Sequence, residues 1–235
     1  MLKVEEIHAY YGRSHILHGA NLKVNEGELV TLLGRNGAGK TTTLKSIMGL
    51  VSVRSGSIQF KGKNIVGKET HDIFRHGLGY VPQGRHIFSS LTVTENMRLP
   101  SVALGRGKGK DEERMEWVLN IFPSLRQRMK NRGNELSGGE QQMLAIARVL
   151  VSGSDLILLD EPSEGLAPKV LGTIMDAIRE FKKSGLTTLL VEANLTVASN
   201  LGDRHYIMAY GVVACEASSQ QLMEDEDLQR KYFKL

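Results

Sequence analysis

The sequence predicts an α/β protein that has a largely parallel sheet and carries an inserted helical region. Three observations lead to this fold class. Short runs of β-forming or apolar residues alternate along the chain with segments of helical spacing. The runs are apolar, as expected for strands of a parallel sheet that is covered on both faces. From about residue 88 to residue 151 the strand pattern stops, and only helical spacing between breakers remains.

Several runs have the length and composition of strands. None approaches the roughly 18–20 apolar residues that cross a bilayer, so we expect them to form a sheet and not membrane spans. The predicted strands are Lys3–His8, Leu29–Leu33, Ser57–Phe60, Leu78–Val81, Leu156–Leu159, Thr188–Val191 and His205–Met208.

Helical spacing is clearest in two segments. In both, apolar residues recur at i, i+3, i+4 and i+7, which places them on one face of an amphipathic helix. These residues are Leu171, Ile174, Met175 and Ile178 in one segment and Met115, Val118, Leu119 and Phe122 in the other.

The second helical segment follows a charged, glycine-rich stretch, Gly105–Arg114. We expect this stretch to be a solvated connector, because no aromatic residue interleaves its charges as nucleic-acid binding would favour. A helical insert over about 88–151 is therefore predicted to interrupt an α/β core.

Composition excludes several classes of protein. The chain has 235 residues, of which 41% are hydrophobic and 24% charged, and this excludes wholesale disorder. Its single cysteine, Cys215, can form neither an internal disulfide nor a metal cluster. Acidic residues near Met1 argue against a signal peptide. The formal charge of +4 is too small to indicate a polyanionic partner.

The strongest motif is a phosphate-binding loop at Gly34–Thr41. Its sequence, Gly-Arg-Asn-Gly-Ala-Gly-Lys-Thr, fits G-x-x-x-x-G-K-[ST] and joins an apolar strand to a helix-forming segment, Thr41–Met48. Backbone N–H groups of such a loop point at a phosphate chain, and the helix N-terminus adds partial positive charge. Lys40 is expected to reach the β- and γ-phosphates, and the Thr41 hydroxyl to bind Mg²⁺. The loop predicts nucleotide binding.

Two acidic residues end the apolar run that follows Asp155. Ligands of a parallel sheet bind beyond the carboxyl ends of its strands, so Asp160 and Glu161 are expected to face the same crevice as Lys40. Asp160 suits the outer coordination shell of Mg²⁺, and Glu161 suits polarising the water that attacks the γ-phosphate. The alternative is a strand-end pair that only caps the next helix.

The segment Leu136–Gln141 narrows the class of nucleotide-binding protein. Ser137 is a good N-cap, and Glu140 completes a capping box for a helix over Glu140–Val151. The glycine pair after Ser137 costs helix stability, and it is explained if exposed N–H groups must approach an anion. Because the segment lies in the helical insert, a second subunit is expected to present that anion.

The order of these motifs resembles that of ATP-binding cassette (ABC) proteins through essentially the whole chain. The matching landmarks are the phosphate loop, Gln83 after a strand, Leu136–Gln141 and the pair Asp160 and Glu161. The resemblance implies one ABC nucleotide-binding domain over residues 1–235, with a P-loop NTPase (RecA-like) core and an N-terminal antiparallel β portion. Residues 1–87 and 152–235 would form the core with its β subdomain, and about 88–151 the α-helical subdomain.

The resemblance also implies roles for individual residues. Tyr11 matches the aromatic residue that stacks on adenine, and Gln83 would contact Mg²⁺ or the attacking water. Two chains would close head to tail, so that Ser137 and Gly139 of one bind the γ-phosphate held by the other. The implied catalytic residues are Glu161, Gln83 and Lys40, and the implied metal ligands are Thr41, Gln83 and Asp160. The implied ATP ligands are Tyr11, Gly34, Arg35, Asn36, Gly37, Ala38, Gly39, Lys40, Thr41, Thr42, Ser137 and Gly139.

Finer detail in Tyr80–Asn96 and Asp160–Pro168 is similar to the ATPase subunits of bacterial branched-chain amino-acid importers, most of all the smaller one. The ATPase subunits of importers of urea or short amides share much of the sequence of these two segments. The resemblance implies a peripheral ATPase at the cytoplasmic face of the membrane, in a homodimer or with a sister ATPase. Its partners would be two transmembrane permease subunits and, indirectly, a periplasmic or extracellular solute-binding protein, with no nucleic acid.

Two positions depart from the pattern of the family. After the strand Thr188–Val191 the family usually has a histidine that contacts the γ-phosphate, whereas the best-aligned residue here is Ala193. The loop after Glu161 reaches Ala167 where most relatives have Asp. Losing one transition-state contact costs about 2.7–4 kcal/mol, so hydrolysis by a homodimer is expected to be impaired.

Three functions remain open at this point. The first is the energy-coupling ATPase of an amino-acid importer. The second is a soluble ABC ATPase that clamps nucleic acid or the ribosome, against which the single short cassette without a long coiled-coil insertion argues. The third is a degenerate regulatory partner that binds ATP without turnover, which Ala193 favours.

Overall fold

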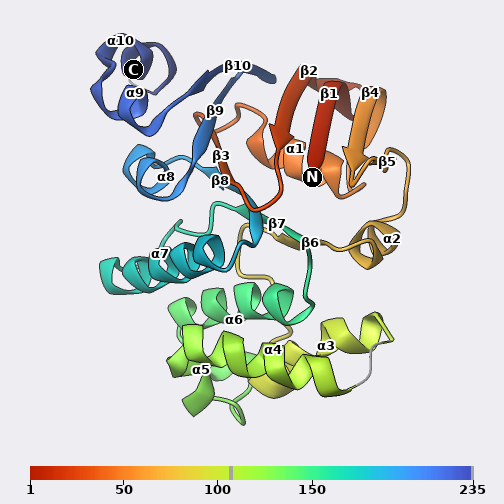
Figure 1. Ribbon diagram of the computed structural model, residues 1–235, viewed down its shortest axis with the longest axis vertical. Coiled ribbons are helices and arrows are strands. Elements are labelled where there is room, and N and C mark those ends of the chain that lie inside the picture. Colours follow the sequence, from red (N-terminus) through yellow and green to blue (C-terminus); the bar gives the residue numbers. More distant parts are fainter. Residues whose placement is uncertain (106–107, 234–235) are drawn as a thin grey trace.

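The computed structural model describes residues 1–105 and 108–233 and contains two sheets (Figure 1). One has four strands in the order β2-β1-β4-β5, and the other has six in the order β10-β9-β3-β8-β7-β6. The strands are β1 Leu2–Tyr11, β2 Ser14–Val24, β3 Leu29–Leu33, β4 Ser52–Phe60, β5 Lys63–Asn64, β6 Leu78–Val81, β7 Leu156–Asp160, β8 Thr187–Glu192, β9 Arg204–Ala209 and β10 Val212–Ala217.

The six-stranded sheet is parallel except for β10, which pairs antiparallel with β9. Its central strands β3, β8 and β7 are buried along their whole length, which explains their apolar sequences. Asp160 pairs with Val191, and Leu33 pairs with Glu192. This register brings the carboxyl ends of the three strands to one edge, where ligands of parallel sheets bind.

Helix α1, Lys40–Ile47, lies between the two sheets (Figure 1). Its buried side chains Leu44 and Ile47 share one apolar cluster with Leu17 of β2 and Val30 of β3. The antiparallel sheet is thus packed onto the helix that begins at the phosphate loop, and this packing fixes the position of the loop.

The region from α3 to α6 is helical and lies at the end of the molecule remote from the antiparallel sheet (Figure 1). A second apolar cluster joins Phe122 and Leu144 of this region to Ile157 of β7 and Phe181 of α7. The helices of the chain are α2 Thr70–Arg75, α3 Val93–Ala103, α4 Lys108–Ile121, α5 Pro123–Gln127, α6 Gly138–Val151, α7 Pro168–Lys183, α8 Leu195–Leu201, α9 Ser219–Glu224 and α10 Glu226–Tyr232, with a 3₁₀ turn at Gly133–Glu135.

The predicted α/β class, with its antiparallel portion and helical insert, is confirmed. Every run predicted as a strand lies within a strand, and none of these runs falls in β2, β5 or β10. The predicted apolar face of α4 is buried at Met115, Val118 and Leu119, and Phe122 is buried just beyond the end of the helix.

The solvated connector predicted over Gly105–Arg114 is wrong for most of its length, because α4 begins at Lys108. Residues 106–107 lie outside the described residues. Asp111 lies in the first turn of α4, where the helix dipole stabilises a negative charge. It also forms an ion pair of 3.8 Å with Arg114, one turn further on. Both interactions favour helix over loop in this charged segment.

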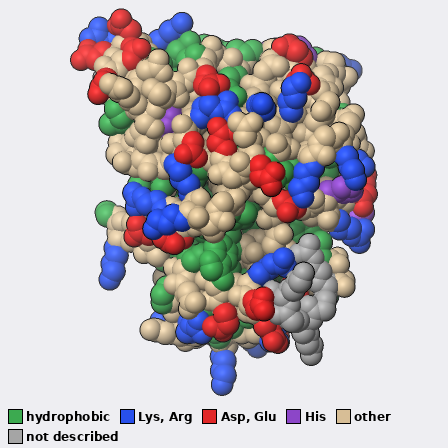
Figure 2. All heavy atoms as spheres, in the orientation of Figure 1, with side chains coloured by type: hydrophobic (Ala, Val, Ile, Leu, Met, Phe, Trp, Pro, Cys, Tyr) green, Lys and Arg blue, Asp and Glu red, His purple; other side chains and the backbone are tan. Residues whose placement is uncertain are grey.

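Within residues 1–105 and 108–233, no helix has both the length and the apolar character needed to span a membrane. Acidic and basic side chains are interspersed on the face shown in Figure 2. The net charge of +4 is therefore not gathered there into a single basic surface.

Candidate functional site

The phosphate loop connects β3 to α1 through a chain of tight turns. Gly37 and Gly39 have φ of 79° and 110°, backbone conformations that favour glycine. Gly39 is also the N-cap of α1, and a glycine has no side chain with which to cap the helix. The N–H groups of the first turn therefore remain available to a bound anion.

Lys40 is held in the loop by three acceptors. Its Nζ donates to the carbonyl oxygens of Gly34 at 2.8 Å and Arg35 at 3.2 Å, and it pairs with Glu161 Oε1 at 3.0 Å. The Lys40 side chain is only 4% exposed and that of Glu161 12% exposed, so the pair is shielded from water. A phosphate that binds Lys40 must compete with the Glu161 carboxylate.

Asp160 accepts two hydrogen bonds from hydroxyl groups. Thr41 Oγ1 donates to its Oδ1 at 2.9 Å, and Tyr80 Oη donates to its Oδ2 at 2.9 Å. Burial raises the pKa of Asp160, although the hydrogen bonds from Tyr80 and Thr41 oppose that shift. Burial, together with the nearby Asp160 charge, also raises the pKa of Tyr80, so its hydroxyl remains a donor.

These residues fit a magnesium site that is completed by phosphate oxygens. Within the described part of the chain, no group of three or more His, Cys, Asp or Glu side chains could hold a metal ion. Mg²⁺ is commonly bound by one or two carboxylates together with substrate phosphates and water. One carboxylate, Asp160, and one hydroxyl, Thr41, next to a phosphate loop match that donor set.

Gln83 and Glu161 meet beside the loop. Gln83 Nε2 donates to Glu164 Oε2 at 2.6 Å and lies 3.3 Å from Glu161 Oε2. Glu161 has φ of +46°, which is uncommon for a residue with a side chain, and its N–H donates to Val191 O at 3.0 Å. Strained backbone of this kind is concentrated at functional sites.

Most of the predicted site residues line one cavity of about 380 Å³. Tyr11 is 47% exposed and forms one wall, at the end of β1. The lining residues are Tyr11, Ile16, Asn36, Gly37, Gly39, Lys40, Thr41, Thr42, Gln83 and Glu161. Asp160 lies beneath it, linked through the Thr41 hydroxyl.

The other predicted residues lie elsewhere. Arg35 and Ala38 line a second cavity of about 230 Å³ together with Tyr210 and Lys231. Ala193 lines a further cavity of about 470 Å³ with Gly34 and Phe233. Ser137 and Gly139 begin α6 and line none of these three cavities.

Ser137 caps α6 in the predicted manner. Its hydroxyl accepts from Glu140 N, and the Glu140 carboxylate accepts from Ser137 N at 2.8 Å. The glycine pair that follows has packing partners within the same chain, because a Cβ on Gly138 would overlap the Arg85 guanidinium and one on Gly139 would lie 2.7 Å from Val170. The space beside the two glycines is thus occupied by the side chains of Arg85 and Val170, and the sequence did not indicate this packing.

Glu192 is a buried acid that sequence reasoning missed. It ends β8, is 1% exposed, and accepts from Ser163 Oγ at 2.8 Å and Ser163 N at 3.3 Å. Burial raises its pKa to about 7. An acidic residue that ends an apolar strand is the signal that identified Asp160, and the same signal was present here.

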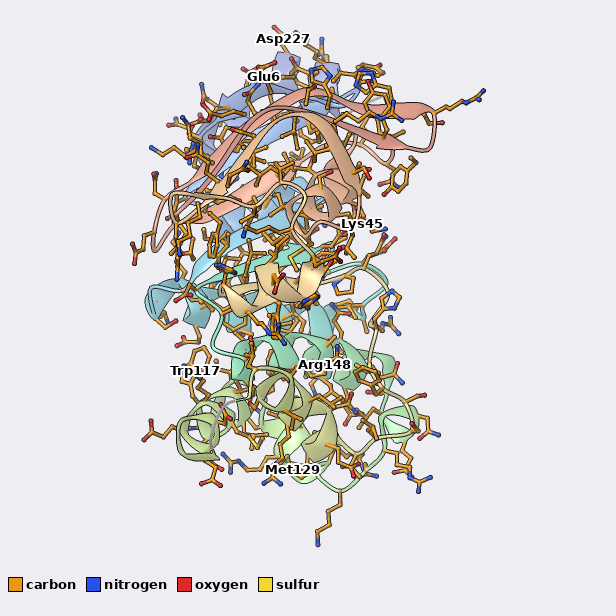
Figure 3. The ribbon with its side chains drawn as sticks, turned by 90° about the vertical axis from the view of Figure 1, so that its right-hand side faces the viewer. Glu6, Lys45, Trp117, Met129, Arg148 and Asp227 are labelled. Atoms are coloured by element: carbon orange, nitrogen blue, oxygen red, sulfur yellow. The ribbon has the colours of Figure 1, made fainter. Side chains whose placement is uncertain are left out.

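A separate apolar groove of about 960 Å³ runs between the α/β core and the helical region. Its exposed apolar side chains include Leu50 and Phe88, which are 53% and 51% exposed. Lys45 and Arg148, labelled in Figure 3, line the groove from α1 and α6. The Arg148 guanidinium lies over the Phe88 ring at 4.9 Å, and its buried Nη1 has no hydrogen-bond partner among the residues that the structure describes.

The chain matches a family described as ABC transporter over residues 17–164. It is 39% identical over 232 residues to the high-affinity branched-chain amino acid transport ATP-binding protein BraG of Pseudomonas aeruginosa, covering 99% of each chain. It is 36% identical over 231 residues to the probable branched-chain amino acid transport ATP-binding protein LivF of Archaeoglobus fulgidus, covering 98% of this chain and 97% of that one. It is also 33% identical over 233 residues to the lipopolysaccharide export system ATP-binding protein LptB of Haemophilus influenzae, covering 99% and 96%.

Solved structures share the fold over nearly the whole chain. A nucleotide-free ATP-binding cassette from an ABC transporter matches with a TM-score of 0.86 and 26% identity, covering 98% of this chain and 96% of that one. A dimeric ATP-binding cassette in a post-hydrolysis state, bound to ADP and Pi, matches with a TM-score of 0.82 and 28% identity, covering 93% and 99%.

Proposed function

This chain belongs to the ABC transporter family, and on that premise we propose that it binds and hydrolyses ATP to drive an importer of branched-chain or related amino acids. One observation carries the proposal: Tyr11, most of the phosphate loop, Gln83 and Glu161 line one cavity. An aromatic face, a backbone cradle with a lysine, and a carboxylate are the groups that adenine, phosphates and an attacking water require.

The nucleotide would lie along this cavity from Tyr11 to Lys40. Adenine would stack on the exposed Tyr11 ring. The phosphates would bind the loop from Gly34 to Thr42 through its backbone N–H groups and the Lys40 ammonium. Mg²⁺, with Thr41, Asp160 and Gln83 as its proposed protein ligands, would neutralise charge on the phosphates when bound.

Glu161 is the proposed general base. Its carboxylate is held by Lys40 at 3.0 Å, so a phosphate that takes over Lys40 would free it to accept a proton from water. Gln83, 3.3 Å from Glu161, is placed to orient that water. Lys40 would at the same time stabilise charge that develops on the phosphate.

A second ATPase chain would complete the site. Ser137 and Gly139 do not line the cavity with Tyr11, so we propose that they bind the γ-phosphate held by a partner in a head-to-tail dimer. The match to a dimeric cassette supports this assembly. The partner is either a second copy of this chain or a sister ATPase.

The membrane partners would be two permease subunits, which place this chain at the cytoplasmic face of the membrane. The apolar groove lined by Leu50 and Phe88 is the proposed seat of a permease helix, because it exposes apolar area that a partner helix would bury. The names of BraG and LivF support branched-chain amino acids as cargo. A solute-binding protein outside the membrane would deliver the cargo to the permeases.

Ala193 gives weight to a second candidate, a regulatory partner that binds ATP with little turnover. Its methyl group offers no hydrogen bond to a γ-phosphate, and it lines a cavity together with Gly34, Arg35 and Asn36 of the loop. The two candidates share ATP binding and differ in hydrolysis.

The test is ATP binding and turnover by the purified chain, alone and with its permeases and sister ATPase. We expect Mg²⁺-dependent ATP binding that is lost in Lys40→Ala, and hydrolysis that is lost in Glu161→Gln. Ala193→His is expected to raise the hydrolysis rate by up to about 10²–10³-fold, the value of one transition-state contact. Unchanged ATP binding by Lys40→Ala would refute the proposal, and binding without turnover in the complete assembly would favour the regulatory candidate.

A further inference from the structure

Arg85 connects three segments that are far apart in the sequence. It follows Gln83 by two residues and has φ of +58°, an uncommon conformation for a residue with a side chain. Its Nη2 donates to the carbonyl oxygen of Gly165 at 3.2 Å. Its guanidinium also lies against Gly138, in the first turn of α6.

The contact with Gly138 explains why glycine is found at that position. Gly138 does not have positive φ, so its backbone conformation does not require glycine. A Cβ there would overlap Nη1 of Arg85 and lie 3.0 Å from its Cζ. Gly138 and Arg85 are therefore complementary in shape, and the guanidinium packs on the backbone that follows Ser137.

The Arg85 guanidinium has no carboxylate partner among the described residues. In the part of the chain that the structure describes, Arg85 forms no ion pair within 4 Å. Its charge adds to the partial positive charge at the N-terminus of α6. Gln83, by contrast, is anchored separately, by its 2.6 Å hydrogen bond to Glu164.

We propose that Arg85 is a positioning residue that acts in trans. It holds the backbone after Ser137 in place for the nucleotide bound by the partner chain and links that segment to the loop that carries Gly165. The inference rests on the head-to-tail dimer of the proposed function. Action in trans is inferred because Arg85 packs directly on Gly138. Its connection to Glu161 of its own chain is indirect, through the loop that carries Gly165 or through Gln83.

Mixed dimers test the direction of this effect. Glu161→Gln silences the nucleotide site of the chain that carries it, so each mixed dimer retains one active site. In the first dimer, a wild-type chain is paired with a chain carrying both E161Q and R85Q, and the active site uses the α6 segment that lacks Arg85. In the second, an R85Q chain is paired with an E161Q chain, and the active site uses an intact α6 segment. Two different affinity tags select each pair.

We expect the first dimer to hydrolyse ATP about tenfold more slowly than a dimer of wild type with E161Q. A tenfold loss corresponds to the loss of one charge-assisted hydrogen bond. The second dimer is expected to match that reference. Slowing of the second dimer alone would place the effect in the chain's own site, and equal slowing of both would indicate a general structural role; either result overturns the proposal. Arg126→Gln, an exposed arginine of α5 paired with Glu116, is the control and should leave both arrangements unchanged.

A second measurement separates this inference from the proposed function. If the wild-type chain hydrolyses no ATP, the proposed ATPase activity fails, and ATP-dependent dimerisation of the E161Q chain then tests Arg85 by size-exclusion chromatography. Adding R85Q is expected to raise the ATP concentration for half-dimerisation about tenfold. An unchanged concentration overturns the role of Arg85.

Discussion

Glu192→Gln should make the stability of this protein less dependent on pH. Glu192 is 1% exposed, and its pKa is raised to about 7 by burial, although Ser163 donates to it through both N–H and hydroxyl. Glutamine has nearly the same shape, and its Oε1 can accept from Ser163 N while its Nε2 donates to the Ser163 hydroxyl oxygen, but it does not titrate. The substitution therefore removes the buried charge while keeping the packing.

The sign and size of the effect follow from linkage. The pKa of Glu192 is about 7 in the folded state against 4.5 in the unfolded state, so the folded protein binds this proton more tightly. Stability from this group is present in full below pH 4.5 and is lost as the pH rises toward and through 7. Integrating between pH 5 and pH 8 gives a loss of about 2.5 kcal/mol in the wild type and none in the glutamine variant.

Urea denaturation followed by circular dichroism at pH 5 and pH 8 measures this difference. Other titrating groups contribute equally to both proteins, so the quantity of interest is the change in unfolding free energy of the wild type minus that of the variant. We expect the wild type to lose about 2.5 kcal/mol more than the variant. Equal losses in the two proteins would refute the inference that Glu192 is buried with a raised pKa.

Two further predictions concern packing and hydrogen bonding. Tyr80→Phe removes the hydroxyl that donates to Asp160 at 2.9 Å, and the unfolding free energy at pH 8 is expected to fall by about 1.5–3 kcal/mol in urea titrations. A change below about 0.5 kcal/mol would show that this bond contributes nothing. Phe122→Ala empties a fully buried position in the helical region, and we expect a loss of about 3–5 kcal/mol. Phe122→Leu, which refills most of the volume, should lose clearly less, and an equal loss from both would contradict the packing argument.

The strands that carry the site could be predicted because they are uniform in sequence. β3, β7 and β8 are buried along their whole length, so each appears as an apolar run. Strand β2 is different: it is an edge strand on which exposed and buried residues mix, and Gly19 interrupts it with φ of 87°. Its sequence pattern is weak because the alternation changes phase at Gly19: Ala20, Leu22 and Val24 are buried at a spacing of two, but Leu17 is out of step with them, and the pairing with β1 shifts register there.

The contacts within the site depend on the order of the strands, which no local pattern contains. Tyr80 reaches Asp160 because β6 is hydrogen-bonded to β7, although nearly eighty residues separate the two in the sequence. The bond of Gln83 to Glu164 and the packing of Arg85 on Gly138 also require the tertiary fold. Motif spacing predicted the phosphate-binding loop and the two acidic residues, but it could not predict which residues contact them.

Charged and polar groups of the site are paired with one another, and under the proposed function this pairing would link nucleotide binding to catalysis. Lys40 holds Glu161 at 3.0 Å, and Glu164 holds Gln83 at 2.6 Å. A phosphate cannot bind Lys40 without competing with Glu161, because both anions need the same buried ammonium. Under the proposed function, the arrival of the γ-phosphate therefore releases the carboxylate that must act on the attacking water. Glu161 then becomes free as a base only when its substrate is present, so its activation needs no separate switch.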